Sequence, residues 1–543
     1  MRRIAFLIIL IKITIFAMAQ CPPPSAQASL AVNNVRANLV NGGDLWFSSM
    51  SQPGYVFPAS GTVSAIFTGG LWLAARDQQD SLRLAAMTYR NQGHDFYPGP
   101  IVSVGGSPQA VCSGFDRFWR TSRADIQAFL DVVESGVPVD VLDIPASVLD
   151  WPGVGNPHLS PLTIDEELAP FIDLNGDGIY DPVDGDHPDI KGDEALFWVV
   201  NDLGGPHQRT GGEPLGVEVR CMAYAWSSPL PAIDNSTFYD ITISNEGGDD
   251  LDDVLVGLFV DVDLGTFNDD LIGCDTSTHS GYVYNGSAID GEYGVDPPIV
   301  AMSFLNRAMG SFVYFNNAAA GPQTDPDTPE EFLNYMQSRW RDGLPIEFGG
   351  DGRLEGTFST SYTYPSNPAF PPGPGVWSEV SAGNVPDDRR FLMCTEPNTL
   401  ADGEVLSLQL VLAGQETNGH SGAPDVDSTL APTLDTIRDM YIDSLSAGNT
   451  YAFTPPPLDT TSVRTAETRQ AVLWPNPARE RLHLTFFEEV NGAVSILDVR
   501  GRTHRRFPVS GMKAVLPVSD LGPGIYILEL DNGRHHRIGR FVR

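Results

Sequence analysis

The sequence has few cysteines, and none of the closely spaced pairs that bind zinc or exchange disulfides. The absence of a C-x-x-C motif argues against a zinc ribbon and against a thiol redox site. An oxidising periplasm would permit disulfide bonds, and an odd number of cysteines leaves at least one thiol unpaired. The connectivity stays open among the five cysteines, which are Cys21, Cys112, Cys221, Cys274 and Cys394.

Positive charge is also scarce. The 33 Lys and Arg residues are outnumbered by 69 Asp and Glu residues, which gives a formal net charge of −36. Such a surface repels the phosphates of nucleic acid and anionic lipid headgroups, so we expect neither as a partner. An acidic surface suits a secreted protein that collects divalent cations and stays in solution.

The signatures of common enzymes are missing. The sequence contains no H-E-x-x-H motif, nucleophile elbow, P-loop or dinucleotide fingerprint. A glycosidase needs two carboxylates that flank a cleft, and the sequence does not single out such a pair among 69 acids. We therefore expect a protein without enzymatic activity, with a secreted hydrolase as the alternative.

The longest apolar run lies at the start of the chain. Arg2 and Arg3 precede the run from Ile4 to Phe16, and Ala17-Met18-Ala19 supplies a small-x-small cleavage site. This order predicts a secretory signal over residues 1–19. No later segment approaches the roughly 18 apolar residues of a membrane span. We expect an exported chain without a transmembrane segment.

Glycine and proline are abundant, with 54 and 43 residues, which favours short strands and turns over long helices. Apolar or alternating runs predict strands over Gly216–Trp226, Thr237–Asn245, Asp253–Asp263 and Glu404–Gly414. The short "EGGDDLDD" turn between the second and third runs indicates neighbours in one antiparallel sheet. The predicted fold is mainly β, with an Ig-like or jelly-roll β-sandwich body and a few short helices.

The predicted organisation follows changes in composition. After the signal we expect a β-rich region over 20–200 and a β-sandwich domain over 201–449. A Pro/Thr-rich linker follows over 450–470 and a separate C-terminal domain over 471–543. Helical patterns are found over Arg123–Glu134, from Thr328 to about Trp340, and from about Leu430 to Ser444.

One acidic stretch has the spacing of a calcium loop. In "DLNGDGIYDPVDGDHPD", oxygen-bearing side chains occupy loop positions one, three, five, nine and twelve, and Gly178 occupies position six. Position twelve is Asp rather than the Glu of an EF-hand, so the loop resembles dockerin or thrombospondin type 3 loops. Tyr180 is expected to anchor it, and the alternative is a solvated acidic turn. The predicted Ca²⁺ ligands are Asp173, Asn175, Asp177, the carbonyl of Ile179, Asp181 and Asp184.

Two further groups of carboxylates are weaker candidates for metal binding. The pattern continues through Asp186, Asp189 and Asp193, which with Asp184 would hold a second ion. Another group occurs in "DVDLGTFNDDLIGCD", where alternate residues at a strand end point to one face. Acidic turns or caps on loop amides are the alternative. The ligands of this last candidate site are Asp261, Asp263, Asp269 and Asp270.

Three motifs follow one another near the end of the chain: "WPNPARERLHL", "VSILDVRGR" and "LGPGIYILEL". In order and spacing they resemble the C-terminal sorting domain of type IX secretion substrates. The resemblance implies a small Ig-like β-sandwich over 471–543 that engages the type IX machinery and crosses the outer membrane. It also implies release of the cargo or its attachment to lipopolysaccharide. This region has 11 Lys/Arg and 7 Asp/Glu, a net charge of +4, in contrast to the acidic body.

The body resembles long uncharacterised exported proteins that carry such a tail, through "NNVRA", "GDEALFWVVND" and "DVDLGTFNDDLIGCD". We expect a secreted or surface-bound calcium-binding protein with a role in adhesion, matrix structure or binding. The alternative is a hydrolase or glycan-binding protein that acts on extracellular polysaccharide. Aromatic side chains on sheets can stack on sugars, although most aromatics belong to cores. The candidates are Trp46, Trp72, Trp119, Trp151 and Trp377.

Overall fold

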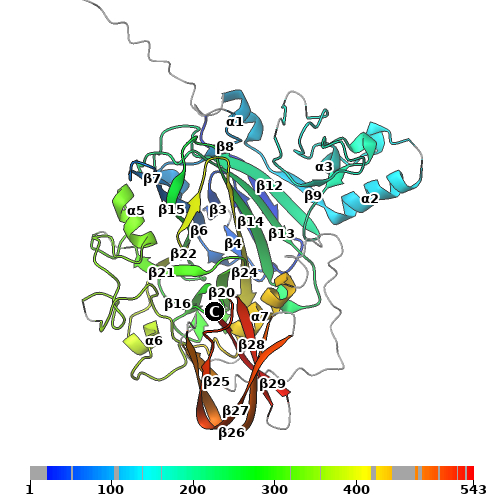
Figure 1. Cartoon of the computed structure of the whole chain (residues 1–543). Coiled ribbons are helices and arrows are strands. Elements are labelled where there is room, and N and C mark those ends of the chain that lie inside the picture. The colour runs from blue at the N-terminus through cyan, green and yellow to red at the C-terminus, as the bar shows by residue number, and fades with distance from the viewer. Residues whose placement is uncertain are drawn as a thin grey trace, which may run out of the picture.

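The computed structural model confirms a mainly β chain with short helices (Figure 1). The expected signal over 1–19 and the linker over 450–470 lie outside the described residues. The structure describes residues 21–49, 53–102, 109–136, 138–159, 162–164, 166–317, 320–354, 356–417, 423–442, 471–474, 480–498, 502–522, 524–531 and 535–543.

The first large sheet of the body has eleven strands, with the order β21-β22-β15-β6-β3-β2-β4-β5 and β1, β7 and β23 paired beside this path. The pairings are antiparallel. The strands are β1 (Gln27–Leu30), β2 (Arg36–Val40), β3 (Asp44–Phe47), β4 (Tyr55–Val56), β5 (Ser64–Ile66), β6 (Thr68–Arg76), β7 (Leu82–Ala86), β15 (Leu251–Asp261), β21 (Met309–Asn316), β22 (Arg389–Thr395) and β23 (Asn398–Leu400).

The second large sheet has nine strands in the order β16-β17-β20-β24-β14-β13-β12-β8, and β9 pairs with β12. Both sheets contain strands from each side of residue 200, and the boundary expected there stays a prediction. The strands are β8 (Tyr97–Pro98), β9 (Trp119–Ser122), β12 (Glu194–Asn201), β13 (Val217–Ala225), β14 (Ser236–Asn245), β16 (Asp270–Asp275), β17 (Ser280–Asn285), β20 (Ile299–Phe304) and β24 (Val405–Gln415).

The four strands expected from the sequence are present as β13, β14, β15 and β24, but one connection was wrong. The "EGGDDLDD" segment joins β14 to β15 across the two sheets instead of forming a hairpin. The reason is that β13 and β24 already occupy both edges of β14, so β15, which is shielded along nearly its whole length, pairs elsewhere. Such a strand needs a partner on each edge, and it finds them in β6 and β22.

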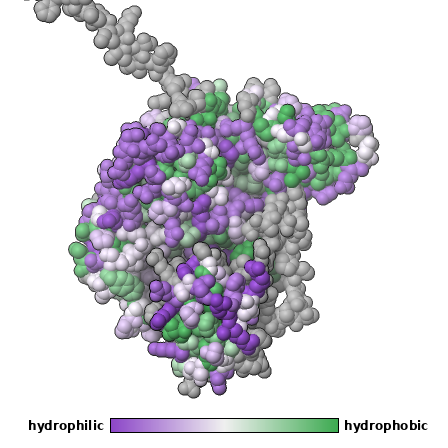
Figure 2. All heavy atoms as spheres, viewed as in Figure 1, coloured by the Kyte–Doolittle hydropathy of each residue, from purple (hydrophilic) through white to green (hydrophobic). Residues whose placement is uncertain are grey.

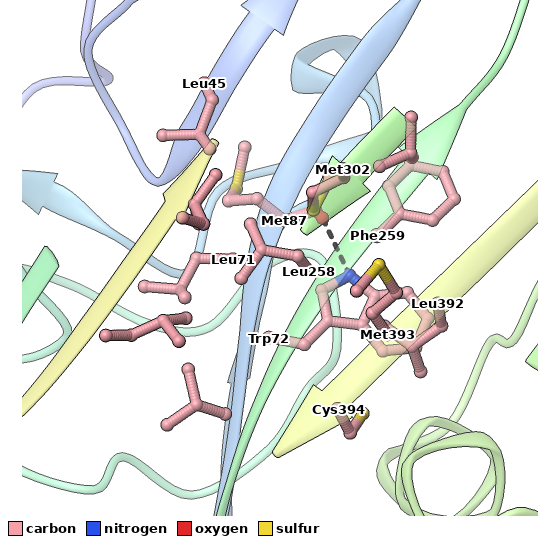
Figure 3. Close-up of a cluster of buried hydrophobic side chains, with 14 of the residues drawn as sticks. Leu45, Leu71, Trp72, Met87, Leu258, Phe259, Met302, Leu392, Met393 and Cys394 are labelled. Atoms are coloured by element: carbon pink, nitrogen blue, oxygen red, sulfur yellow. Dashed lines mark hydrogen bonds between the residues drawn. The ribbon is translucent and has the colours of Figure 1, made fainter. Parts of the chain in front are cut away.

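The main core fills the space between the two sheets. Trp46 of β3 donates from Nε1 to the hydroxyl of Tyr239 on β14 at 2.9 Å, which ties one sheet to the other. Trp72 donates to the carbonyl of Met87 at 2.8 Å, so its single polar atom is satisfied inside the core (Figure 3). All five tryptophans proposed for sugar stacking are at most 3% exposed, and that assignment was wrong because they pack in cores.

Several helices and a long irregular segment cover the outer face of the nine-stranded sheet, whereas the helix Pro329–Met336 packs on β21 and β22 of the eleven-stranded sheet. The expected helices are confirmed as α2 (Arg123–Glu134), α5 (Pro329–Met336) and α7 (Leu430–Met440), of which α5 ends earlier than expected. A second core packs Trp151 and Tyr180 against Phe197 of β12 and Ile126 of α2. The remaining helices are α1 (Gln109–Phe115), α3 (Ala146–Leu149), α4 (Pro231–Asp234) and α6 (Glu379–Ala382), with 3₁₀ turns η1 (Arg90–Gln92), η2 (Val141–Asp143) and η3 (Pro182–Asp184).

Two cysteines of the body are joined. A disulfide links Cys21 to Cys112, while Cys221, Cys274 and Cys394 are buried free thiols. Hydrophilic side chains cover most of the face of the body seen in Figure 2, as expected from its acidic composition. Among the described residues, no helix has the length and apolar character needed to span a bilayer.

The C-terminal region forms an antiparallel sheet of five strands with its own core. Leu482, Leu484, Leu528 and Leu530 alternate along their strands and are buried, as their spacing predicts. The strands are β25 (Ala471–Trp474), β26 (Arg481–Asp498), β27 (Thr503–Pro517), β28 (Ile525–Asp531) and β29 (His535–Val542).

Candidate functional site

The Asp173–Asp184 stretch, called here the acidic loop, projects from a two-stranded ribbon. β10 (Phe171–Ile172) pairs with β11 (His187–Pro188) and brings the two ends of the loop together. Gly176 and Gly178 both have φ of +79°, a conformation that glycine adopts without strain. The sharp turn expected at position six is therefore present.

Two carboxylates of the acidic loop contact the side chain of Asn175. Asp173 accepts hydrogen bonds from the amides of Gly176 at 2.7 Å and Gly178 at 2.8 Å. The amide nitrogen of Asn175 lies 3.0 Å from a carboxylate oxygen of Asp177 and 3.3 Å from one of Asp184. The carboxylates at positions five and twelve thus meet at Asn175, while the carboxylate at position one is held by amides of the same loop.

Tyr180 anchors the acidic loop, as expected. Its ring is buried and packs edge-on against Phe171, and its hydroxyl donates to the carbonyl of Val148 at 2.5 Å. Asp181 lies beside His158, with the Nε2 to Oδ1 distance at 3.2 Å, and caps the turn η3. The carboxyl of Asp173 has a lowered pKa, chiefly because the Gly178 amide stabilises its charged form.

The residues expected to hold a second ion near this loop serve other contacts. Asp186 is fully buried, and its two oxygens accept from the amides of Leu174 and Asp181 at 2.8 and 3.0 Å. Asp193 accepts from the amide of Ser227 at 3.0 Å and pairs with Arg123. The amide of Asp189 donates to the carbonyl of Pro170. The structure does not bring these three carboxylates together with Asp184.

The second candidate group lies in a pocket of about 410 Å³ at one end of the eleven-stranded sheet. Single carboxylate oxygens of Asp261, Asp263 and Asp388 lie within 4.8 Å of one another. We call these residues the acidic triad. The other residues that line the pocket are Phe47, Phe67, Tyr89, Asn91, Gln92, Phe267, Asn317, Asp325 and Arg390.

Strand register assembles the triad. β15 and β22 are antiparallel with Asp261 opposite Arg390, and the same register extended by two residues places Asp263 opposite Asp388. Positions two apart on a strand point to the same face, so these four side chains meet on one side of the sheet. The Asp261 and Asp263 pair was foreseen from its spacing, whereas Asp388 was missed.

One guanidinium lies inside this cluster. Arg390 contacts Asp388 at 3.0 Å and approaches Asp261 and Asp325 at 3.4 Å each. It also donates from Nε to the hydroxyl of Tyr89, and that hydroxyl donates to Oδ2 of Asp261 at 2.7 Å. Burial opposes the charge of Arg390, but attraction to Asp261 and the other acids prevails and raises its pKa.

The carboxylates of the pocket receive too few hydrogen bonds to offset their burial. Oδ1 of Asp261 is buried without a hydrogen-bond partner, and no donor among the described residues reaches the carboxylate of Asp263. Burial, followed by repulsion from Asp388, raises the pKa of Asp263 to about 7. Burial likewise raises the pKa of Asp261 well above its ordinary value.

Asp269 and Asp270 lie near the pocket but do not line it. Asp270 is fully buried and accepts from the amide of Leu264 at 3.0 Å, which fixes the loop after β15. One oxygen of each of these two carboxylates is buried without a hydrogen-bond partner. The structure therefore separates the four acids of this sequence cluster into two pairs.

Comparison with known families assigns the end of the chain. Residues 472–542 match the secretion system C-terminal sorting domain. The chain carries a type IX sorting domain. Export to the cell surface or the extracellular space follows from this tail, as does handling by the type IX machinery.

Comparisons of the body are uninformative. No curated protein matches the sequence. A polysaccharide lyase is 10% identical with a TM-score of 0.20, over 60% of this chain and 34% of that one. A family GH92 inverting mannosidase from Bacteroides thetaiotaomicron is 8% identical with a TM-score of 0.17, over 47% and 26%. The BSP domain of a biofilm-associated protein is 8% identical with a TM-score of 0.13, over 64% and 59%. Scores this low carry no argument about the body, whose resemblance to other exported proteins stays a prediction.

Proposed function

We propose that the body is a calcium-binding protein without enzymatic activity, which acts in adhesion, matrix structure or binding outside the cell. The observation that carries this proposal is the convergence of Asp177 and Asp184 on Asn175, with Asp173 already oriented by two backbone amides. Calcium prefers six to eight oxygen ligands, and the acidic loop offers them from its carboxylates, Asn175 and the carbonyl of Ile179.

The calcium ion acts as a clamp. The acidic loop is joined to the second core through Tyr180, which is fully buried between Phe171 and Val148 of α3. An ion that fixes the loop therefore stabilises the layer over the nine-stranded sheet. In this proposal the side-chain amide of Asn175 rotates so that its oxygen faces the ion. The ion then takes the place of the amide nitrogen, which in this structure contacts Asp177 and Asp184.

The experiment is a thermal melt of the purified protein in chelator and in calcium. Extracellular calcium sites often bind at roughly 10⁻⁴–10⁻³ M, so the titration must reach millimolar ion. Calcium should raise the melting temperature, and Asp177→Ala should reduce that response. Asp252→Asn, an exposed acid on β15, is the control that should respond as the native protein does. An unchanged response in Asp177→Ala would refute a calcium clamp in the acidic loop.

A secreted hydrolase is the second candidate, and the acidic triad is the observation that favours it. Several carboxylates and the aromatic side chains of Phe47, Phe67 and Phe267 line one pocket, and paired carboxylates are the groups that glycosidases use. A glycan array combined with hydrolysis assays separates the two candidates. Retention of a polysaccharide without turnover supports a binding protein, whereas turnover that Asp263→Asn abolishes supports the hydrolase.

The tail can be tested separately. Deletion of residues 473–543 should leave the protein in the periplasm, because the sorting domain is removed while the signal at the start remains. Attachment to surface lipopolysaccharide is the proposed fate of a chain that stays with the cell. Extraction of the exported protein with and without lipopolysaccharide-releasing treatment would then distinguish an anchored chain from a free one.

A further inference from the structure

We infer that the acidic triad of Asp261, Asp263 and Asp388 is a second site for a hard divalent cation, with calcium as the expected ion. This site is independent of the acidic loop and is built from side chains far apart in sequence. It goes beyond the proposed clamp because its ion would neutralise a pocket of the sandwich rather than fix a surface loop.

The spacing of the oxygens fits one ion. Calcium binds oxygens at 2.3–2.6 Å, so two oxygens on the same ion lie at most about 5 Å apart. The three carboxylates of the triad each present an oxygen within 4.8 Å of the others. One cation can therefore touch all three without a rearrangement of the strands that hold them.

One carboxylate oxygen of the acidic triad lacks a hydrogen-bond partner among the described residues. Asp261 is 3% exposed, and both of its neutralising contacts, from Tyr89 and Arg390, go to Oδ2. Oδ1 has no hydrogen-bond partner, and a buried carboxylate oxygen left in this state is costly. A cation bound beside Asp261 compensates the buried charge to which that oxygen belongs.

The charge of the pocket also calls for a cation from outside the chain. Four acids line it against the single guanidinium of Arg390, a net charge of −3 when all are ionised. The whole sequence has three lysines, and the one in the body, Lys191, is paired with Asp240 at 2.6 Å. No further basic side chain lines the described pocket, so the excess negative charge is relieved either by protonation or by a bound divalent ion.

Water molecules in the pocket supply the remaining ligands of the ion. Arg390 and Asn317 each donate to one oxygen of Asp388, at 3.0 and 2.9 Å, so this carboxylate has little capacity left for an ion. The triad alone therefore supplies fewer ligands than the six to eight that calcium prefers. A space of about 410 Å³ is much larger than one ion and admits the water molecules that fill the other positions. The site is therefore open on its solvent side.

Calorimetric titration of calcium into the chelator-treated, purified full chain tests the inference, because it counts ions at each site. The native protein should bind two ions, and Asp177→Asn, which disables the acidic loop, should bind one. Asp263→Asn should also bind one ion within the concentration range of the titration, because loss of a charged ligand weakens the triad by about tenfold or more. The double variant should bind none, and Asp252→Asn should bind two.

The outcomes separate this inference from the clamp. If the acidic loop does not bind calcium, the native protein binds one ion, which Asp263→Asn removes and Asp177→Asn retains. If Asp263→Asn binds as many ions as the native protein with unchanged affinity, the triad does not bind calcium and water alone fills the pocket. Asp388→Asn must give the same result as Asp263→Asn, and retained calcium binding in both variants overturns the inference.

Discussion

The acidic loop and the acidic triad hold crowded carboxylates in opposite ways. In the loop, backbone amides donate to Asp173, and the charged form of that residue is favoured. In the triad, Asp263 has no donor among the described residues and Asp261 has one orphaned oxygen, and their charged forms are disfavoured by burial. An exposed turn can compensate its own charge, whereas a buried cluster depends on counter-ions.

The largest difference between the two regions should follow removal of the buried guanidinium. Arg390→Met leaves the acids of the pocket without their cation, and loss of one partner of a buried pair costs about 3–5 kcal/mol. The free energy of unfolding in urea and chelator measures this. Arg76→Met, which removes a partly exposed pair with Asp80, is the control and should cost no more than about 1 kcal/mol. Equal costs would show that the pocket is as well solvated as the surface.

Loss of the hydroxyl of Tyr89 in the pocket should cost more than loss of the hydroxyl of Tyr180 below the acidic loop. Tyr89→Phe removes a hydrogen bond to the carboxylate of Asp261, and bonds to charged groups contribute about 1.5–3 kcal/mol. Tyr180→Phe removes a bond to a neutral carbonyl, which contributes about 0.5–1.5 kcal/mol. Urea denaturation of both variants in chelator gives the comparison. A larger loss for Tyr180→Phe would contradict the charge assigned to the pocket.

Removal of one carboxylate from the triad should stabilise the ion-free protein. Asp263→Asn keeps the shape of the side chain but relieves burial and repulsion of a charge, which should raise the free energy of unfolding by about 1 kcal/mol in chelator at pH 8. With calcium at ten times its dissociation constant the native protein gains about 1.4 kcal/mol from binding at this site. In calcium the native protein should therefore have the higher free energy of unfolding. A variant that is less stable than the native protein in chelator would refute this account.

The corresponding change in the acidic loop should have the smallest effect. Asp177 is exposed, and the surrounding loop is held by backbone amides and by Tyr180. Asp177→Asn should therefore change the free energy of unfolding in chelator by less than about 0.5 kcal/mol, while it removes part of the calcium response. Urea titrations with and without calcium measure both quantities.

Sequence reasoning located the loop because its information is local. The spacing of Asp173, Asn175 and Asp177 around Gly178 specifies a turn without reference to the rest of the chain, and the tail motifs likewise form one continuous region. The strands β13, β14, β15 and β24 were found from apolar patterns for the same reason. Their distribution between two sheets was not predicted, because the sequence of a connecting turn does not determine which strands pair with each other.

The triad required tertiary information. Asp263 and Asp388 are far apart in sequence, and they meet only because β15 pairs with β22 in one particular register. "DDRR" at Asp387–Arg390, directly before an apolar strand, was the available signal, since acids and arginines at a strand end can face a partner strand. Nothing in the sequence stated that this partner would be the strand that ends at Asp261.

The most direct measurement is a crystal structure of the protein grown in millimolar calcium, with anomalous differences recorded to locate the ion. The account predicts one peak within the acidic loop and another between Asp261, Asp263 and Asp388, each at about 2.3–2.6 Å from carboxylate oxygens. Ordered water in both places, without an anomalous peak at either, would contradict it.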